Sequence, residues 1–161
     1  MPEVIANTSP LQYLFQVGLL DLLPQLYGQV RVPHAVSDEL TRGLALGVPL
    51  PRLEHLPWVK LVEPVSRTLL PLASGLGAGE LQVIALALDT PDHLALLDDR
   101  RARRFADLLG VVYTGTLGVL LKAKSAGLVG TLAPICDTLT RQGFRLSPDT
   151  RRGMLDLAGE P

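Results

Sequence analysis

The stretch Leu94-Ala95-Leu96-Leu97-Asp98-Asp99-Arg100-Arg101-Ala102-Arg103-Arg104 decides the fold class of this 161-residue chain. Its first four residues form an unbroken apolar run, which is typical of a strand buried on both faces of a sheet. The two aspartates are residues that start helices, and the segment after them ends at Gly110. A buried strand that leads directly into a helix is the unit from which parallel α/β sheets are built.

The same alternation of strand and helix recurs on both sides of this stretch. Short apolar runs predict strands at residues 4–6, 30–32 and 111–113, with weaker candidates at 58–62 and 144–146. Helix-start residues and terminal glycines predict helices between them, at 10–17, 19–27, from 33, 80–88, 100–109, 116–126, 131–141 and from 148. Strands separated by helices predict an α/β fold with a mostly parallel sheet that helices cover on both faces.

The composition agrees with one folded domain. The chain is 47% hydrophobic and 19% charged, which excludes a disordered protein. We expect residues 1–146 to form the domain and residues 147–161 to add a C-terminal helix or tail to it. There are 15 Lys and Arg against 16 Asp and Glu. This balance excludes a strongly basic protein that coats nucleic acid, but it leaves room for a local basic patch.

The sequence shows no pattern typical of a membrane span, a signal peptide or a set of paired cysteines. Apolar runs such as Leu81–Leu88 are far shorter than the roughly 20 residues that a membrane span needs. The first residues, Met1–Ile5, lack the basic and apolar regions of a signal peptide. The single cysteine, Cys136, excludes a disulfide framework and a multi-cysteine zinc site. We therefore expect a cytoplasmic protein that does not engage a membrane.

Oxygen-bearing side chains gather where the predicted strands end. Asn7, Asp98 and Asp99 each come directly after a strand, and Glu39 and Glu80 lie on helices that could flank the same cleft. In parallel sheets, ligands bind beyond the carboxyl ends of the strands. Clustered carboxylates repel one another unless a cation holds them, and oxygen ligands select hard ions such as Mg²⁺ or Mn²⁺. These residues therefore suggest a metal site that acts on phosphodiesters.

The same acids have a second interpretation as helix caps and surface charges. Asp98 and Asp99 are good cap residues, and Glu80 in a first turn complements the helix dipole. Glu39 could pair with Arg42, three residues further along a helix. Spacing alone leaves both interpretations open.

The basic cluster that follows the aspartates also has two interpretations. Arg100, Arg101, Arg103 and Arg104 either hold backbone phosphates or form a solvated helix face. Other motifs are weaker: the histidines share no metal-ligand spacing, and the glycine-rich segment at 75–79 lacks the lysine of a phosphate-binding loop.

Six segments in order resemble PIN-domain proteins, and most closely the PIN-like family DUF3368. They are Val4-Ile5-Ala6-Asn7-Thr8-Ser9-Pro10-Leu11, Gly18-Leu19-Leu20-Asp21-Leu22-Leu23, Val32-Pro33-His34-Ala35-Val36-Ser37-Asp38-Glu39-Leu40, Gly77-Ala78-Gly79-Glu80 with Ile84-Ala85-Leu86-Ala87, Leu97-Asp98-Asp99-Arg100-Arg101-Ala102-Arg103, and Gly115-Thr116-Leu117-Gly118 through Gly127-Leu128. The resemblance covers about residues 4–130. It implies a three-layer α/β/α sandwich with a central, mostly parallel sheet.

The resemblance also implies an activity. PIN domains are typically metal-dependent ribonucleases, and many prokaryotic ones are toxins of the VapC type that an antitoxin holds. The chain is thus expected to be an endoribonuclease that uses Mg²⁺ or Mn²⁺ on RNA, as the toxin-like member of a toxin–antitoxin pair. The residues that match the family's acidic positions, first to fourth, are Asn7, Glu39, Glu80 and Asp98 or Asp99, with Asp98 favoured. Ser9 and Thr116 would be polar support near the metal, and Arg100 or Arg103 would grip phosphate.

One departure from the family pattern opens further hypotheses. Asn7 supplies a neutral oxygen where PIN nucleases usually have a carboxylate, which removes one negative charge from the site. The chain could therefore be a catalytically attenuated PIN-like module that binds RNA or a protein. A third hypothesis is a structural protein that forms a homodimer through the leucine-rich helices around residues 11–26.

Overall fold

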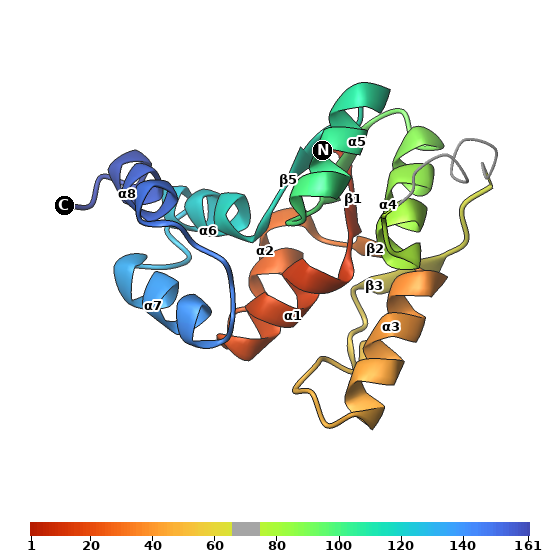
Figure 1. Cartoon of the computed structure of the whole chain (residues 1–161), viewed down its shortest axis with the longest axis horizontal. Coiled ribbons are helices and arrows are strands. Elements are labelled where there is room, and N and C mark those ends of the chain that lie inside the picture. The colour runs from red at the N-terminus through yellow and green to blue at the C-terminus, as the bar shows by residue number, and fades with distance from the viewer. Residues whose placement is uncertain (66–74) are drawn as a thin grey trace.

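The computed structural model describes residues 1–65 and 75–161, in which five strands form one sheet with the order β3-β2-β1-β4-β5 (Figure 1). Every neighbouring pair is parallel. The strands are β1 (Glu3–Ala6), β2 (Val30–Pro33), β3 (Val59–Val62), β4 (His93–Leu96) and β5 (Tyr113–Thr114). The parallel sheet expected from the sequence is therefore confirmed, including the weak candidate that became the edge strand β3.

Residues 144–146 do not form the strand that their alternating pattern predicted, so this prediction is wrong. They join two helices, and the ring of Phe144 packs edge-on against Tyr13 with 5.0 Å between the ring centroids. A three-residue segment forms a strand only where a neighbouring strand satisfies its backbone groups. Here the apolar side chain of Phe144 packs the loop between the two helices against Tyr13.

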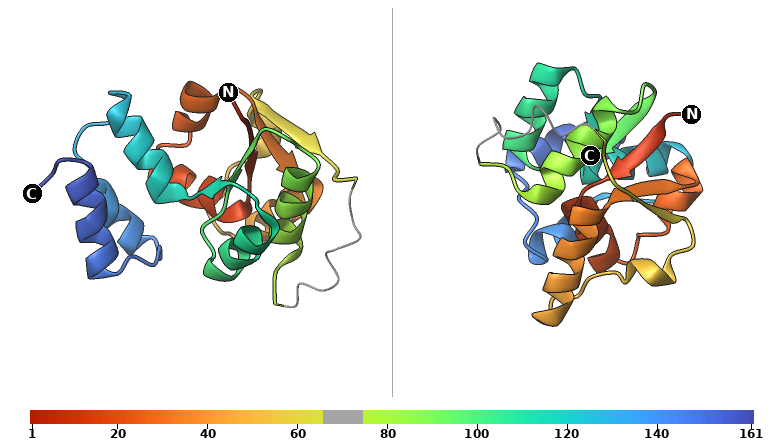
Figure 2. Two further views of the ribbon diagram at one scale, coloured as in Figure 1. Left: turned by 90° about the horizontal axis from the view of Figure 1, so that it is seen from above. Right: turned by 90° about the vertical axis from the view of Figure 1, so that its right-hand side faces the viewer.

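Helices lie on both sides of the sheet. They are α1 (Thr8–Gln16), α2 (Leu22–Tyr27), α3 (His34–Ala45), α4 (Ala78–Leu88), α5 (Arg100–Leu109), α6 (Thr116–Ser125), α7 (Ala133–Arg141) and α8 (Pro148–Leu157), with a short 3₁₀ turn η1 (Leu53–His55). Helix α4 packs across β1, β2 and β4 and contacts α5, whereas α1 and α2 pack with α6 on the other side (Figure 2). Helix α3 contacts both α1 and α4. The three-layer α/β/α sandwich is thus confirmed.

Four leucines of the first two helices lie in the core. Leu11, Leu14, Leu22 and Leu23 are at most 4% exposed. They pack in the same hydrophobic cluster as the strands, because an α/β sandwich buries the inner face of each helix against the sheet. These leucines therefore do not supply the apolar surface that the homodimer hypothesis expected of them.

The sheet has a topological switch point between β1 and β4. The chain leaves β1 toward β2 and β3, and later returns to the opposite side of β1 to form β4 and β5. The backbone N–H of Asn7 donates to the carbonyl of Leu96 at 3.2 Å, so the ladder between these strands continues to their last residues. Crevices at such points are where open α/β sheets bind ligands.

The last two helices join the same core and are tied to α6. Cys136 and Met154 belong to the hydrophobic cluster of the sheet. The carboxylate of Glu160 accepts hydrogen bonds from Lys124 Nζ at 2.6 Å and from the backbone N–H of Leu132 at 2.8 Å. The bond from Lys124, together with the backbone donors at the start of α7, lowers the pKa of Glu160. The C-terminal end of the chain is thereby anchored beside α7.

None of the helices in the described part of the chain is both long enough and apolar enough to cross a membrane.

Candidate active site at the carboxyl edge of the sheet

Asn7 stands at the end of β1 with an unused oxygen. It occupies the N-cap position of α1, where an asparagine side chain ordinarily accepts a bond from the first turn, but it makes no such bond. The residue is 3% exposed, and its Oδ1 atom is buried with no hydrogen-bond partner among residues 1–65 and 75–161. Leaving a buried acceptor unpaired costs about 1–3 kcal/mol. Such a group needs an explanation, and coordination of a cation is one.

Asp98 lies just beyond β4, across the switch point from Asn7, and is held at the start of α6. Its Oδ1 accepts from the backbone N–H of Thr116 at 2.8 Å, and its Oδ2 accepts from the Thr116 hydroxyl at 2.7 Å. Thr116 is completely buried, so both donors are fixed. Burial raises the pKa of Asp98, while the bonds from Thr116 and the nearby Arg103 lower it. The structure thus places Thr116, which the family resemblance implied as polar support near a metal, as the group that orients the Asp98 carboxylate.

Glu39 reaches from α3 to the start of α4. Its Oε1 accepts from the backbone N–H of Gly79 at 2.9 Å, and its Oε2 accepts from the Thr8 hydroxyl at 2.5 Å. A Cβ atom at position 79 would lie only 2.7 Å from Oε2, so the glycine is what allows this close approach. Glu39 is therefore braced between two helix starts and does not pair with Arg42.

Glu80 and Asp99 act partly as the caps that the second interpretation expected. Glu80 Oε2 accepts from the backbone N–H of Gly77 at 3.2 Å, in a capping box at the start of α4. Asp99 Oδ2 accepts from the N–H of Ala102 at 3.0 Å as the N-cap of α5, and its side chain is exposed. Burial raises the pKa of Glu80 despite the Gly77 bond, and the charges of Asp99 and Glu39 raise it further. The charges of Asp99 and Glu39 therefore act on the protonation of Glu80.

The acids do not converge on one point. Within residues 1–65 and 75–161, no three His, Cys, Asp or Glu side chains form a group that could hold a metal ion. Each carboxylate is instead held by backbone N–H groups at the start of a helix: Glu39 and Glu80 at α4, Asp99 at α5 and Asp98 at α6. Ser9, the other predicted support residue, is a half-buried residue in the first turn of α1.

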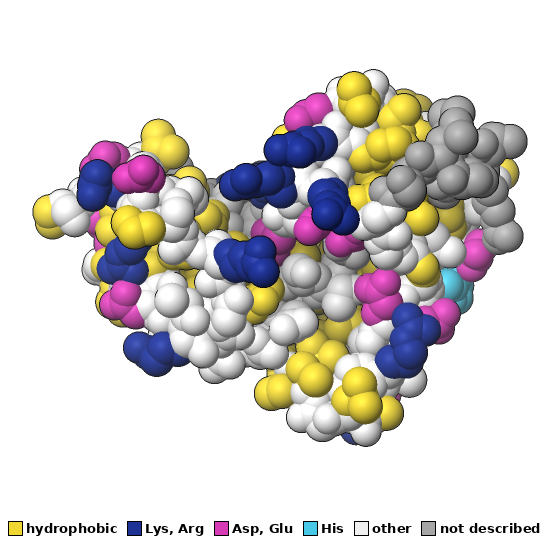
Figure 3. All heavy atoms as spheres, viewed as in Figure 1, with side chains coloured by type: hydrophobic (Ala, Val, Ile, Leu, Met, Phe, Trp, Pro, Cys, Tyr) yellow, Lys and Arg dark blue, Asp and Glu magenta, His cyan; other side chains and the backbone are white. Residues whose placement is uncertain are grey.

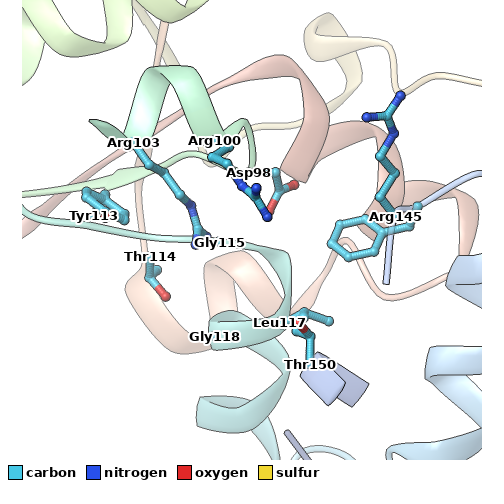
Figure 4. A pocket seen from close by; sticks show the side chains of 11 residues that line it. Asp98, Arg100, Arg103, Tyr113, Thr114, Gly115, Leu117, Gly118, Arg145 and Thr150 are labelled. Carbon is cyan, nitrogen blue, oxygen red and sulfur yellow. The ribbon is translucent and has the colours of Figure 1, made fainter. Parts of the chain in front are cut away.

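Basic side chains border the Asp98 side of this edge. Figure 3 shows a hollow in the middle of one face, with basic side chains along its upper rim and acidic ones beside them. A cleft of about 490 Å³ here is lined by Asp98, Arg100, Arg103, Tyr113, Thr114, Gly115, Leu117, Gly118, Phe144, Arg145 and Thr150 (Figure 4). Both arginines that the sequence analysis singled out for phosphate therefore lie in one cleft with Asp98.

The two arginines expected to bind phosphate differ in burial and in their contacts. Arg103 is half-buried, its Nε donates to the Leu97 carbonyl at 2.7 Å, and its guanidinium lies 5.2 Å from the centre of the Tyr113 ring. Arg100 is exposed at the start of α5. Arg103 is thus part of the wall of the cleft, whereas Arg100 lies at its edge and pairs with no acid in the described part of the chain.

Sequence reasoning missed the C-terminal wall of this cleft. Phe144, Arg145 and Thr150 come from the segment between α7 and α8 and the start of α8. Their distance of about 50 residues from Asp98 along the chain gave no local signal. The apolar pattern that led to the wrong strand prediction at 144–146 was the nearest sign that this segment carries a half-buried ring.

Comparison with known proteins gave one match, to a protein family. A family model described as DUF3368, a PIN domain, matches residues 3–160. Searches of curated proteins and of solved structures gave no significant match to this chain.

Proposed function

This chain belongs to the DUF3368 family of PIN domains, and from that premise we propose that it is an endoribonuclease that depends on Mg²⁺ or Mn²⁺. Membership supports nuclease-type activity, RNA as a partner and the use of a divalent metal in general terms. The observation that carries the proposal is the buried, unpaired Oδ1 of Asn7 at the switch point, opposite the braced Asp98.

The donor set fits a hard divalent cation. Asn7 offers a neutral amide oxygen with no other partner, and Asp98 offers a carboxylate whose orientation Thr116 fixes. Glu39, Glu80 and Asp99 supply the remaining negative charge. Burial is the main reason that the pKa of Glu80 is raised, and the charges of Asp99 and Glu39 raise it further, which favours a cation among the three acids. Because fewer than three of these acids gather in one group, we expect substrate phosphates to complete the coordination.

Each residue of the site would have a separate role in cleavage. A bound ion would activate water and stabilise the leaving oxygen of the phosphodiester. Asp98 and Glu39 hold fixed negative charge on the two sides of the switch point, because helix-start donors and threonine hydroxyls orient them. Glu80 keeps its Oε1 outside the capping box, and its raised pKa suits a group that takes up or releases a proton there. Arg100 and Arg103 offset the charge of the phosphate backbone.

Cleavage of RNA tests this function directly. We expect the purified protein to cut a labelled, unstructured RNA in the presence of Mn²⁺, and the variant Glu39→Gln with Asp98→Asn to be inactive. A protein that cuts no RNA with Mn²⁺, and that this double substitution leaves unchanged, would contradict the proposal.

The second candidate function is an attenuated PIN module that binds RNA or a protein without cutting. The neutral Asn7 and the dispersed acids favour it. The substitution Asn7→Asp separates the two candidates, because it restores the carboxylate of the family pattern. If the natural protein is attenuated, Asn7→Asp creates cleavage and tightens Mn²⁺ binding by about tenfold in a calorimetric titration, the scale typical of changes around a metal site.

The biological setting is a further part of the proposal. We place the protein in the cytoplasm as the toxin-like member of a toxin–antitoxin pair, acting as a homodimer. The family resemblance of the site-bearing segments supports the toxin role. A neighbouring reading frame for a small DNA-binding protein would support the pairing, and light scattering of the purified chain would measure its oligomeric state.

A further inference from the structure

The cleft beside Asp98 has walls from three separate parts of the chain. Arg100 and Arg103 come from α5, Gly115 and Leu117 from the start of α6, and Arg145 from the segment between α7 and α8. Figure 4 shows Arg100 and Arg103 on one side, Arg145 on the other, and Asp98 between them. Its volume of about 490 Å³ lies within the 300–1,000 Å³ range of sites that take one small ligand.

The cations at the rim of this cleft have no internal partner. Within the described residues, Arg100 and Arg145 form no ion pair and no side-chain hydrogen bond. Elsewhere the chain does pair its arginines, as Arg31 with Glu3 at 3.0 Å and Arg151 with Asp137 at 2.6 Å. Two unpaired guanidinium groups on opposite sides of one cleft suit an anion with more than one charged group, because planar guanidinium forks bind phosphate oxygens well.

Apolar side chains line the same cleft. Phe144 is half-buried, and its edge-on contact with Tyr13 fixes the position of its ring. Leu117 adds aliphatic surface. A ligand that fills this space must therefore combine a flat or apolar body with negative charge at its ends.

We propose that this cleft binds one unpaired nucleotide of a single-stranded RNA, with its base against Phe144 and its flanking phosphates at Arg100 and Arg145. The inference rests on the proposed nuclease function, and it names the form of RNA and the subsite. Bases in a single strand can stack on an aromatic ring, whereas bases in a duplex are already stacked on one another. An acidic protein segment would satisfy the arginines, but its acidic side chains carry no ring that could stack on the aromatic wall.

Binding in the absence of cleavage tests the subsite. The probe is a fluorescein-labelled ten-nucleotide RNA without secondary structure, measured by anisotropy in EDTA at several salt concentrations. We expect Arg145→Ala to weaken binding by at least about fivefold and to reduce the slope of log K against log salt by about 0.7, the share of one phosphate contact on a single strand. The matched control is Arg104→Ala, which removes the same charge from an exposed position on α5 outside the cleft, and we expect it to change affinity less than twofold.

The aromatic wall has its own test. Phe144→Leu keeps an apolar side chain, so we expect the fold to survive with a small fall in melting temperature from the lost ring contact with Tyr13. Affinity for the single strand should fall by about threefold or more, because stacking on the ring is lost. A 2-aminopurine base in the probe would report stacking as a fluorescence change that Phe144→Leu abolishes.

Three outcomes would overturn the proposal. They are equal losses for Arg145→Ala and Arg104→Ala, equal affinity for a duplex of the same length, and tighter Arg145-dependent binding of a ten-residue glutamate peptide, which would make the cleft a protein-binding site. The nuclease function fails separately. If RNA binding follows the predicted pattern but Mn²⁺ gives no cleavage, the proposed subsite is supported and the nuclease function is contradicted. If the protein cleaves RNA but Arg145→Ala leaves the affinity unchanged, the nuclease function is supported and the subsite is contradicted.

Discussion

Asp98 and Glu39 are braced in the same way but have opposite neighbours. In each, one oxygen accepts from a backbone N–H at the start of a helix and the other from a threonine hydroxyl: Thr116 supplies both bonds for Asp98, and Gly79 with Thr8 supplies them for Glu39. Asp98 borders Arg103 and an open cleft, whereas Glu39 lies near the carboxylate of Glu80. The shared bracing orients a carboxylate, and the surrounding charge decides what that carboxylate attracts.

The difference divides the candidate site into two halves. The Asp98 half combines one acid with arginines, so it can position a phosphate of the nucleic acid beside the cation that Asn7 and Asp98 would hold. The Glu39 half combines acids with acids, which adds the negative charge that favours a cation in the site. A nuclease needs both halves, since a divalent ion acts on a phosphate that the protein has positioned.

The largest expected effect comes from removing the Asp98 charge. Asp98→Asn keeps the size of the side chain but offers only one oxygen to Thr116, and we expect cleavage to fall by on the order of 100-fold or more, the scale of a positioned catalytic group. Asp99→Asn is the matched variant, because asparagine is also a good N-cap for α5. It should lower the rate by about tenfold or less, because Asp99 adds negative charge near the site but is exposed and caps α5. Equal losses in the two variants would mean that Asp99 shares the role.

Gly79→Ala tests the Glu39 half with a smaller effect. The new Cβ would displace the Glu39 carboxylate, so we expect cleavage to fall by about tenfold, as for other changes that misplace a ligand. Stability should change by less than about 1 kcal/mol, because alanine favours the helix while one hydrogen bond is lost. Gly153→Ala in α8 meets open space and should leave the rate unchanged. An unchanged rate in Gly79→Ala would show that Glu39 tolerates displacement.

Thr116→Val probes the bracing itself. Valine has nearly the shape of threonine but cannot donate to Asp98 Oδ2, so the free energy of unfolding should fall by about 1.5–3 kcal/mol, the usual contribution of a hydrogen bond to a charged group. Thr90→Val removes a buried bond between uncharged groups, from Oγ1 to the Leu86 carbonyl, and should cost only about 1 kcal/mol. Chemical denaturation of both variants measures the difference. Equal costs would mean that the charge of Asp98 adds nothing to this bond.

The smallest effect is a change in how stability depends on pH. Burial raises the pKa of Asp98 above its ordinary 3.8 and that of Glu80 above 4.5, so the folded protein holds these protons more tightly than the unfolded chain. Their contribution to stability is therefore complete below the ordinary values and is lost as pH rises through the folded pKa. Glu160, whose pKa is lowered by Lys124, has the opposite sign and loses its contribution as pH falls.

Denaturation between pH 4 and 7 checks this dependence. Asp98→Asn should make the decline in stability with rising pH less steep, by well under the roughly 1.4 kcal/mol per pH unit that one full proton allows. A steeper decline in Asp98→Asn than in the natural protein would show that the pKa of Asp98 is lowered on folding instead.

Local signals in the sequence were enough to predict most elements of the fold. The apolar runs that became β1, β2 and β4, and the glycines that end α5 and α7, specify structure through neighbours in the chain. The prediction failed at 144–146, where alternation alone could not show that no strand lies alongside. It also failed for Leu11, Leu14, Leu22 and Leu23, which are buried because those faces of α1 and α2 meet the sheet.

The candidate site was predictable in its residue types but not in their arrangement. The position of Asn7, Asp98 and Asp99 after strands placed them at the carboxyl edge of the sheet. The sequence left Asp98 and Asp99 as alternatives, and the fold separates them, since Asp98 is held by Thr116 beside the cleft and Asp99 caps α5. Arg145 could not be found in advance, because only the return of the chain after α7 brings it opposite Arg100.

The sequence by itself determined the elements, their alternation and the edge at which the acids gather, because strand runs, helix caps and terminal glycines act within a few residues. Tertiary structure alone decided the charge balance of that edge. It left the Asn7 oxygen buried with no hydrogen-bond partner in the described structure. It also oriented Asp98 and Glu39 with donors far away in the chain, and set arginines from two regions around one cleft. Burial and hydrogen bonding are properties of surfaces that meet, and no local pattern encodes which surfaces those are.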